Sequence, residues 1–195
     1  MTVGVLGLQG DVREHLAALS RCGIEARVVR RVEETQDLSG LVLPGGESTA
    51  ISLLGQGGLL ETLRQHAAAG LPMFGTCAGM ILLAAKIEGA AAPHIGAIDI
   101  TVARNASGRQ VDSFETVLAV EGIGDAVPAV FIRAPYITRV GQDVVVLARY
   151  HDVPVMARQG NVLVASFHPE LTTDTRIHRY FGEIVERSEL EVPSS

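Results

Sequence analysis

The sequence predicts an α/β fold in which a mixed β-sheet carries helices on both faces, giving three layers. The first observation is a set of short segments that are apolar at every position, such as residues 3–8 and 41–43, which is typical of parallel strands buried on both faces. The second is that helix-forming segments alternate with them in the order β-α-β-β-α-β-α up to residue 86. The third is a change after residue 93 to short strands separated by turns, which favours antiparallel pairing.

The first strand covers residues 3–8, and a helix follows from residue 12. Asp11 suits the N-cap of this helix, because a carboxylate oxygen accepts a hydrogen bond from a free backbone N–H of the first turn. The apolar stripe of the helix ends at Cys22, and His15 lies at the edge of the stripe. We therefore expect Cys22 to belong to the core and His15 to be structural rather than catalytic.

The next elements bring two loops to one edge of the sheet. A second strand is predicted at residues 26–30, and a third at residues 41–43 leads into Pro-Gly-Gly-Glu-Ser. A helix at about residues 58–69 precedes a fourth strand, after which residues 80–86 are rich in helix formers. Because ligands of parallel sheets bind at the carboxyl ends of the strands, we expect the loops after the third and fourth strands to meet.

The second half of the chain is predicted to contain more strands and one closing helix. Five short apolar segments are predicted strands, at residues 98–102, 116–120, 129–132, 144–147 and 153–157. A last apolar strand covers residues 162–167, and a helix closes the chain at about residues 174–187. We expect a single domain over residues 1–188 and a flexible C-terminal tail over residues 189–195.

Length and composition restrict the class of protein. A chain of 195 residues with 47% hydrophobic and 19% charged residues suits one globular domain with a sizeable core. The net charge of −6, without a Lys/Arg run, argues against binding to nucleic acid or to an anionic membrane. We expect no signal peptide and no transmembrane helix, and the two cysteines suggest no disulfide framework, so a reducing, cytoplasmic location is the natural expectation.

The motif Gly-Thr-Cys-Ala-Gly at residues 75–79 joins the fourth strand to the following helix. It is the cysteine form of a nucleophile elbow, a sharp strand-to-helix turn that presents a reactive side chain. The N-terminus of the helix favours the thiolate of Cys77, and the N–H of Ala78 is a candidate oxyanion donor. Taken alone, a cysteine at this position is more often a small apolar side chain beside a glycine-rich turn, and it is the segments later in the chain that favour the nucleophile.

A cysteine nucleophile needs a base, and the base needs a group that orients it. His168 and Glu170 follow the last apolar strand, with Pro169 between them. In an extended His-Pro-Glu segment both side chains lie on one face, so Glu170 can orient His168 toward Cys77. We therefore expect a Cys77–His168–Glu170 triad, although His-Pro-Glu by itself is a common turn.

The glycines at positions 45 and 46 supply a second candidate for oxyanion stabilisation. A backbone N–H in such a pair, here that of Gly46, can point into the site beside the N–H of Ala78. The alternative is a plain turn before a helix that Ser48 caps. The position of the pair at a strand end, on the sheet that also carries the elbow, favours the functional interpretation.

Three segments together resemble the signatures of class I, triad-type glutamine amidotransferases: residues 44–48, 75–79 and 166–170. More narrowly, the chain resembles the glutaminase-subunit family of pyridoxal 5′-phosphate synthases, on blocks at residues 4–10, 104–105, 108–115, 131–135 and 168–172. These blocks lie in order along nearly the whole chain. The chain departs from the family pattern at Ser107, where the family usually has an aromatic residue.

The resemblance implies a class I glutamine amidotransferase-like fold and the hydrolysis of L-glutamine to L-glutamate and ammonia by Cys77, His168 and Glu170. It implies that the ammonia passes to a barrel-shaped synthase subunit that makes pyridoxal 5′-phosphate, in a hetero-oligomeric complex. The chain itself is expected to bind no cofactor and no metal, because it has no glycine-rich phosphate loop, no cofactor lysine motif and no zinc-ligand spacing.

The resemblance also assigns glutamine binding to a set of six residues: Gly46, Glu47, Ser48, Arg104, Ile132 and Arg133. This agrees in kind with the substrate, because a zwitterionic amino acid needs a cation for its carboxylate and acceptors for its ammonium group. For the two arginines, solvated surface charge is the alternative.

Three other functions compete with this interpretation. The chain can be a glutaminase subunit that serves another ammonia acceptor, as in histidine biosynthesis, but residues 4–10 and 104–115 argue against it. It can be a cysteine hydrolase or peptidase outside the amidotransferases, which the order of Cys and His-x-Glu disfavours. A glutamine-binding regulatory subunit or a thiol redox sensor would fit a chain that lacked Cys77 or His168, and both are present.

Overall fold

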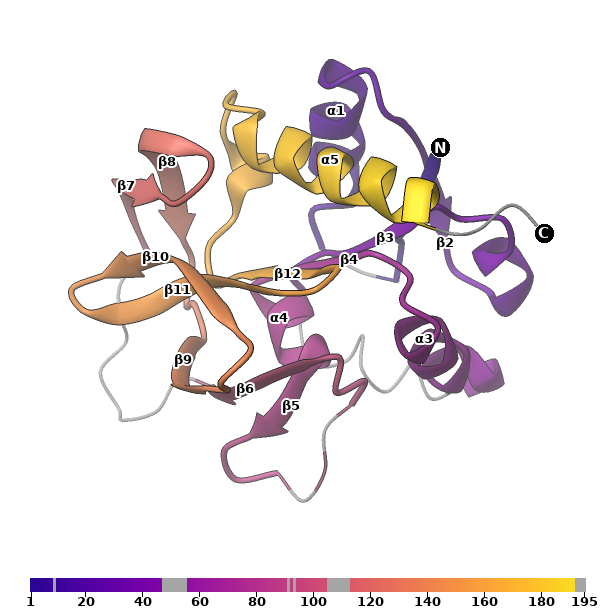
Figure 1. Cartoon of the computed structure of the whole chain (residues 1–195), viewed down its shortest axis with the longest axis horizontal. Helices are drawn as coiled ribbons and strands as arrows, with labels where there is room; N and C mark the ends of the chain where they lie inside the picture. The colour runs from indigo at the N-terminus through magenta and orange to yellow at the C-terminus, as the bar shows by residue number, and fades with distance from the viewer. Residues whose placement is uncertain (9, 47–55, 91, 93, 105–112, 192–195) are drawn as a thin grey trace.

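The computed structural model describes residues 1–8, 10–46, 56–90, 92, 94–104 and 113–191. Its centre is a seven-stranded sheet with helices on both faces (Figure 1), so the predicted three-layer α/β fold is confirmed. Across the sheet the strand order is β10-β11-β12-β4-β3-β1-β2. The strands are β1 (Thr2–Leu6), β2 (Glu25–Val29), β3 (Gly40–Leu43), β4 (Met73–Thr76), β10 (Val145–Tyr150), β11 (Val153–Gln159) and β12 (Val162–Ala165).

The middle of this sheet is parallel and its β10–β11 edge is antiparallel. Strands β12, β4, β3, β1 and β2 pair in parallel, whereas β11 pairs antiparallel with β12 and with β10. Strand β4 is therefore central, with β3 on one side and β12 on the other. The carboxyl ends of these three strands meet at one edge, where the predicted elbow, glycine pair and His-Pro-Glu segment all follow.

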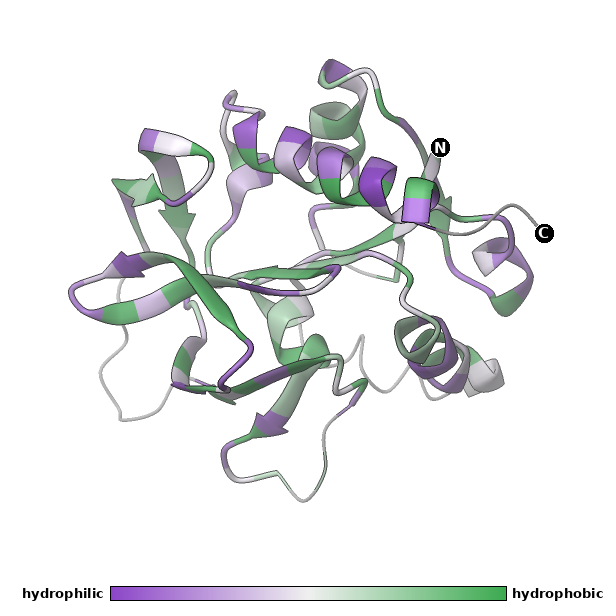
Figure 2. Cartoon of the chain, viewed as in Figure 1, coloured by the Kyte–Doolittle hydropathy of each residue, from purple (hydrophilic) through white to green (hydrophobic). Residues whose placement is uncertain are grey.

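Two hydrophobic cores lie on the two faces of the sheet. Helices α1 (Val12–Arg21) and α5 (Arg176–Glu191) cover one face, and α3 (Leu59–Ala68) and α4 (Ala78–Leu83) cover the other (Figure 1). Along β3, Val42 joins the core under α1 and α5, while Leu41 and Leu43 join the opposite core. This alternation explains why the central strands are apolar at every position, as Figure 2 shows in green.

The remaining strands form two small sheets. One contains β5 (Ala84–Ile87), β6 (Ile98–Ala103) and β9 (Tyr136–Val140), and the other is the hairpin of β7 (Phe114–Val120) and β8 (Gly124–Phe131). The helix expected over residues 80–86 is wrong beyond Leu83, because from Ala84 the backbone is extended and pairs with β6. Tertiary pairing here overrides the helix propensity of the local sequence.

Two strands of this half differ from the prediction. Strand β9 was not predicted, and β8 begins five residues before the predicted residue 129. Pro128 interrupts the strand pattern of β8, but a two-stranded hairpin leaves an open edge on which proline is tolerated.

The chain ends in a longer helix than expected. Helix α5 continues to Glu191, so residues 189–191, which we expected to begin the flexible tail, extend the helix instead. The segment contains two glutamates and a leucine, which favour helix, and residues 192–195 lie outside the described part. The short 3-10 helices are η1 (Val32–Thr35), η2 (Gln56–Gly58) and η3 (Pro169–Leu171).

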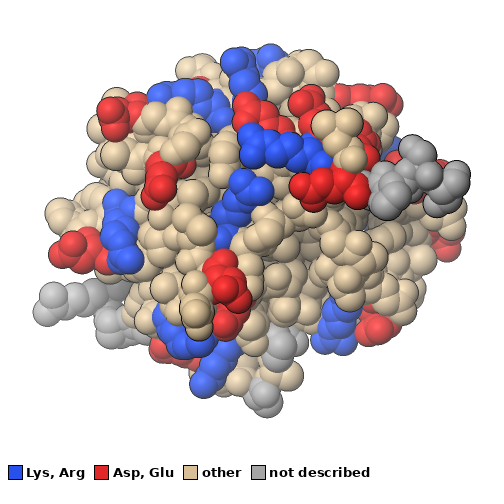
Figure 3. Space-filling view, in the orientation of Figure 1, with Lys and Arg blue, Asp and Glu red and all other residues tan. Residues whose placement is uncertain are grey.

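The described surface carries charges of both signs. On the face shown in Figure 3, the Lys and Arg side chains are interspersed with Asp and Glu side chains. Within the described parts of the chain, no helix is both long enough and apolar enough to cross a membrane.

Candidate active site

The elbow places Cys77 in a strained backbone conformation between β4 and α4. Cys77 has φ 50° and ψ −109°, and its backbone N–H donates to the carbonyl oxygen of Ala165 at 2.8 Å. A positive φ at a residue with a side chain costs about 1–3 kcal/mol and persists only where the surroundings hold it. Here β4 before the turn and α4 after it fix the conformation, as expected of a nucleophile elbow.

The two glycines of the motif are required for close packing rather than for the turn itself. Neither Gly75 nor Gly79 has a positive φ. A Cβ on Gly75 would lie 2.5 Å from the carbonyl oxygen of Gly79, and a Cβ on Gly79 would overlap the carbonyl oxygen of Leu43. The motif therefore lets α4 lie directly against β4 and β3, while Cys77 alone makes the sharp turn.

His168 and Glu170 form the hydrogen bond that the sequence predicted. His168 Nδ1 lies 2.7 Å from Glu170 Oε1, and both side chains are buried. The backbone N–H of His168 donates to the carbonyl oxygen of Val130 at 2.8 Å, so β8 anchors the histidine. The expected extended segment is wrong, because Pro169 begins the 3-10 turn η3 and its fixed φ suits that position.

Cys77 also contributes to the electrostatics of His168. Burial lowers the pKa of His168, but hydrogen bonds to Cys77 and to Glu170, together with their charges, outweigh burial and raise the pKa to about 10. Burial raises the pKa of Glu170, and the hydrogen bond from His168 opposes that rise. At neutral pH the raised pKa favours a protonated His168, which is the charge state that an imidazole beside a cysteine nucleophile needs.

Asp11, which the sequence indicated only as a helix cap, lies within the candidate site. It occupies the N-cap position of α1, yet its side chain makes no capping hydrogen bond. Instead Asp11 Oδ2 lies 3.2 Å from His168 Nδ1, the nitrogen that also contacts Glu170. Its position after β1, at the carboxyl edge of the sheet, is the signal that could have placed it here.

Asp11, His168 and Glu170 also have ligand atoms within 4.8 Å of one another, close enough to share a metal ion. The hydrogen bonding of His168 Nδ1 accounts for this closeness.

The predicted glycine pair lies against Cys77 and His168. A Cβ on Gly45 would come within 2.7 Å of His168 Cε1 and 3.2 Å of Cys77 Cβ, so this loop lines the site directly. Gly10, which has φ 92°, packs closely on Gly45. A Cβ on Gly10 would overlap the carbonyl oxygen of Gly45. Gly46 is exposed beside them.

Two more candidates flank this loop in the sequence: the predicted binding residues Glu47 and Ser48. Both lie outside the described residues. The other candidate oxyanion donor, Ala78, is the first residue of α4, where a backbone N–H has no carbonyl partner within the helix.

The other candidates for glutamine binding are two residues that follow β8 and one that follows β6. Ile132 and Arg133 directly follow β8, two and three residues after Val130, whose carbonyl accepts the bond from His168. Arg133 is exposed and has φ 42°. Arg104 follows β6 in the small sheet, and its hydrogen-bond partner among the described residues is His94, at 3.3 Å. Ser107 lies outside the described residues.

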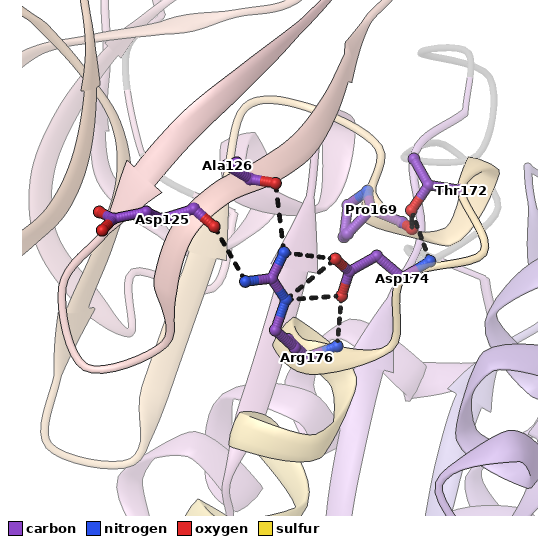
Figure 4. Close-up of polar contacts among 6 residues, drawn as sticks. All are labelled: Asp125, Ala126, Pro169, Thr172, Asp174 and Arg176. Carbon is purple, nitrogen blue, oxygen red and sulfur yellow. Dashed lines mark hydrogen bonds and ion pairs between the residues drawn. The ribbon is translucent and has the colours of Figure 1, made fainter.

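A network at the start of β8 ties this strand to the closing helix (Figure 4). Arg176, at the beginning of α5, donates to the carbonyl oxygens of Asp125 and Ala126 at 3.0 and 3.2 Å. Its guanidinium also donates to both carboxylate oxygens of Asp174, from Nε to Oδ1 at 3.1 Å and from Nη2 to Oδ2 at 2.6 Å. No pattern in the sequence indicates this contact, which holds the strand that anchors His168.

Comparisons with known proteins agree over nearly the whole chain. The model of a family described as "SNO glutamine amidotransferase family" matches residues 5–187. The chain is 56% identical over 189 residues to "Pyridoxal 5'-phosphate synthase subunit PdxT" of Geobacillus thermodenitrificans, covering 96% of this chain and 97% of that protein. It is also 56% identical over 187 residues to the protein of that name from Carboxydothermus hydrogenoformans, covering 95% and 98%.

Solved structures lead to the same fold. A crystal structure of a glutamine amidotransferase superposes with a TM-score of 0.88 at 52% identity, covering 94% of this chain and 98% of that one. A putative GMP synthase component from Thermoplasma acidophilum superposes with a TM-score of 0.71 at 17% identity, covering 98% and 97%, and supports the fold alone.

Proposed function

The chain belongs to the SNO glutamine amidotransferase family, and from that premise we propose that it hydrolyses L-glutamine to L-glutamate and ammonia. We propose further that it delivers the ammonia to a synthase subunit that makes pyridoxal 5′-phosphate, because its full-length relatives are named as subunits of that synthase. The observation that carries the proposal is the elbow cysteine, Cys77, facing a buried His168 that Glu170 holds at 2.7 Å.

The reaction follows from the charge states of these groups. The thiolate of Cys77 attacks the side-chain amide carbon of glutamine and forms a tetrahedral oxyanion. His168, protonated, gives its proton to the departing nitrogen, so ammonia leaves and a thioester remains. The neutral His168 then takes a proton from water, whose oxygen attacks the thioester carbon and releases glutamate and the thiolate. Glu170 stabilises the imidazolium before ammonia leaves and again after water is activated.

The oxyanion of both tetrahedral states needs two donors. We assign them to the backbone N–H groups of Ala78 and Gly46, because one is free at the start of α4 and the other lies on the loop that touches Cys77. Glutamine binding is assigned to residues around this loop and after β8 and β6: Gly46, Glu47, Ser48, Arg104, Ile132 and Arg133. A cytoplasmic location suits this chemistry, since Cys77 must stay reduced.

The two arginines give a prediction about substrate binding. Arg133→Ala is expected to raise KM for glutamine about 10- to 100-fold with a smaller change in kcat, because one charged hydrogen bond contributes about 1.5–3 kcal/mol. Arg104→Ala should have a smaller effect, because its guanidinium contacts His94. Steady-state kinetics of the two variants test this. An unchanged KM in both variants would show that the two arginines are solvated surface charges that do not bind glutamine.

The activity is expected to depend on the partner. A peptide flip in the glycine pair at positions 45 and 46 would turn one oxyanion donor away, and losing one donor costs roughly 10²–10³ in kcat. We therefore expect weak hydrolysis by the isolated chain and a rise in kcat of one to three orders of magnitude when the synthase subunit docks. Glutamate release at saturating glutamine, with and without the synthase, measures this.

The control is an unrelated ammonia-accepting synthase, such as that of histidine biosynthesis, which should not activate the chain. Activation by that control alone would assign the chain to another pathway. Full activity of the isolated chain, unchanged by any partner, would show that the oxyanion site is already complete.

A further inference from the structure

A second pair of buried histidines lies behind the triad. His15 of α1 and His178 of α5 are both fully buried, although histidine has only an intermediate tendency to be buried. His15 Nδ1 lies 3.0 Å from His178 Nε2, and His15 Nε2 lies 3.1 Å from Thr76 Oγ1. Thr76 directly precedes the nucleophile Cys77, so the pair contacts the elbow from underneath.

His15 also faces the carboxylate that orients the catalytic histidine. Its Nε2 lies 3.5 Å from Glu170 Oε2. That oxygen is buried and has no hydrogen-bond partner among the described residues, whereas the other oxygen of Glu170 binds His168. A buried carboxylate oxygen without a donor is costly, and His15 Nε2 is the donor positioned to face it.

Only one pair of tautomers satisfies these contacts. An ionised Glu170 accepts hydrogen bonds and donates none, so His15 must carry its proton on Nε2. Its bare Nδ1 then accepts from Nε2–H of His178, which leaves Nδ1 of His178 without a proton. That nitrogen is the buried atom of His178 with no partner among the described residues. At His178 Nδ1, a lone pair without a partner costs less than an N–H without a partner. If His15 carried its proton on Nδ1 instead, the lone pair of its Nε2 would face the carboxylate of Glu170.

Both histidines are held neutral by their surroundings. Burial lowers the pKa of His15 well below its ordinary value, with His178 and His168 adding to the effect. Burial lowers the pKa of His178 to about 4, with Arg21 adding to it. Each imidazole therefore has one donor and one acceptor at neutral pH, as the tautomer assignment requires.

We propose that His15, oriented by His178, is a positioning residue of the triad: its Nε2–H, shared with Thr76, holds the second oxygen of Glu170 and thereby fixes the orientation of His168. This proposal rests on the proposed glutaminase reaction for its kinetic consequence. It adds two residues to the predicted Cys77–His168–Glu170 triad: His15, which we expected to be structural, and His178, to which the sequence assigned no role.

Loss of the donor changes the ionisation of Glu170. The groups that face Glu170 are His168 from the turn before η3, Asp11 from the loop before α1, and His15 from α1. Without His15, one oxygen loses its donor while the Asp11 charge and the burial remain, so protonated Glu170 is favoured up to a higher pH. Protonated Glu170 no longer stabilises the imidazolium of His168, and activity at low pH is lost.

The experiment uses the chain in its complex with the synthase. His15→Leu should lower kcat about 10- to 100-fold, the range known for outer partners that orient the ligands of metal sites, with KM changed less than threefold. The acid limb of its kcat–pH profile should move to higher pH. His15→Gln places an amide N–H near the position of Nε2 and should recover most of kcat and of the acid limb. Leu19→Ala, a matched change on the same face of α1, should lower the melting temperature without moving the pH profile.

The kinetic result that would overturn the proposal is a pH profile of His15→Leu that matches the profile of Leu19→Ala, together with a kcat of His15→Gln no higher than that of His15→Leu.

A second measurement needs no variant and no activity. The ¹⁵N chemical shifts of the wild-type chain should show His15 as the Nε2–H tautomer between pH 6 and 8. An Nδ1–H tautomer, or titration of His15 in that range, would contradict the proposal even if glutaminase activity is confirmed. The expected tautomer in a wild-type complex without glutaminase activity would reject the proposed function instead.

Discussion

Cys77→Ala is expected to abolish glutamine hydrolysis, with a loss of at least about 10⁴-fold in the complex with the synthase, because no other group can form the thioester. The change should leave the fold intact. Alanine keeps the Cβ of cysteine, so the strained φ of 50° at this position is neither relieved nor worsened. Glutamate release measures the activity, and sedimentation of the mixed subunits measures docking.

The matched control is Cys22→Ala. Cys22 is also a free, half-buried cysteine, and its Sγ donates only a weak hydrogen bond to the carbonyl oxygen of Thr175 at 3.6 Å. Its loss should leave kcat within about twofold of the wild-type value. Equal residual activities of the two variants would reject Cys77 as the nucleophile.

His168→Asn is expected to lower kcat almost as much, by roughly 10³–10⁴-fold, because one imidazole serves as acid for ammonia and as base for water. Asparagine keeps a polar side chain but cannot be protonated, so both proton transfers fail. The pH profile gives the second readout. The wild-type enzyme should lose activity as pH rises through the pKa of His168, about 10, where the imidazolium disappears.

Glu170→Gln should retain more activity than His168→Asn, because Asp11 Oδ2 also lies 3.2 Å from the ring nitrogen that Glu170 orients. The double variant Asp11→Asn, Glu170→Gln should therefore lose more than the two single losses predict. Activity of Glu170→Gln at or above the wild-type level would remove Glu170 from the mechanism.

The proximity of the proposed triad residues could be predicted from the sequence because each of the two segments that carry them is local. Cys77 lies between Gly75 and Gly79, which are both needed so that α4 can pack closely on the sheet. His168 and Glu170 follow a strand that is apolar on both faces. Parallel topology then places both segments at one edge of the sheet. The parallel centre of the sheet could also be predicted from the sequence. Its strands face a hydrophobic core on each side, so β3 and β12 contain no polar residue.

What could not be predicted depends on contacts between distant segments. Nothing in the local sequence shows that the side chain of Asp11 contacts His168 instead of capping α1. Nor does it show that His15 faces Glu170, which lies 155 residues later in the chain. Strand β5 was missed for the same reason, because its partner β6 overrides a helical sequence. The tie from Arg176 to the start of β8 likewise needs the fold before it can be seen.

The most direct test of the proposed mechanism is the site of covalent modification by an alkylating glutamine analogue. Such a reagent needs both glutamine recognition and an activated thiol, so it reports on binding and on the nucleophile at once. The complex with the synthase is incubated with the analogue, with and without excess glutamine, and the two cysteine peptides are analysed by mass spectrometry. We expect stoichiometric modification of Cys77 that glutamine prevents, with Cys22 unmodified. Modification chiefly at Cys22, or modification of Cys77 that glutamine does not slow, would contradict the mechanism.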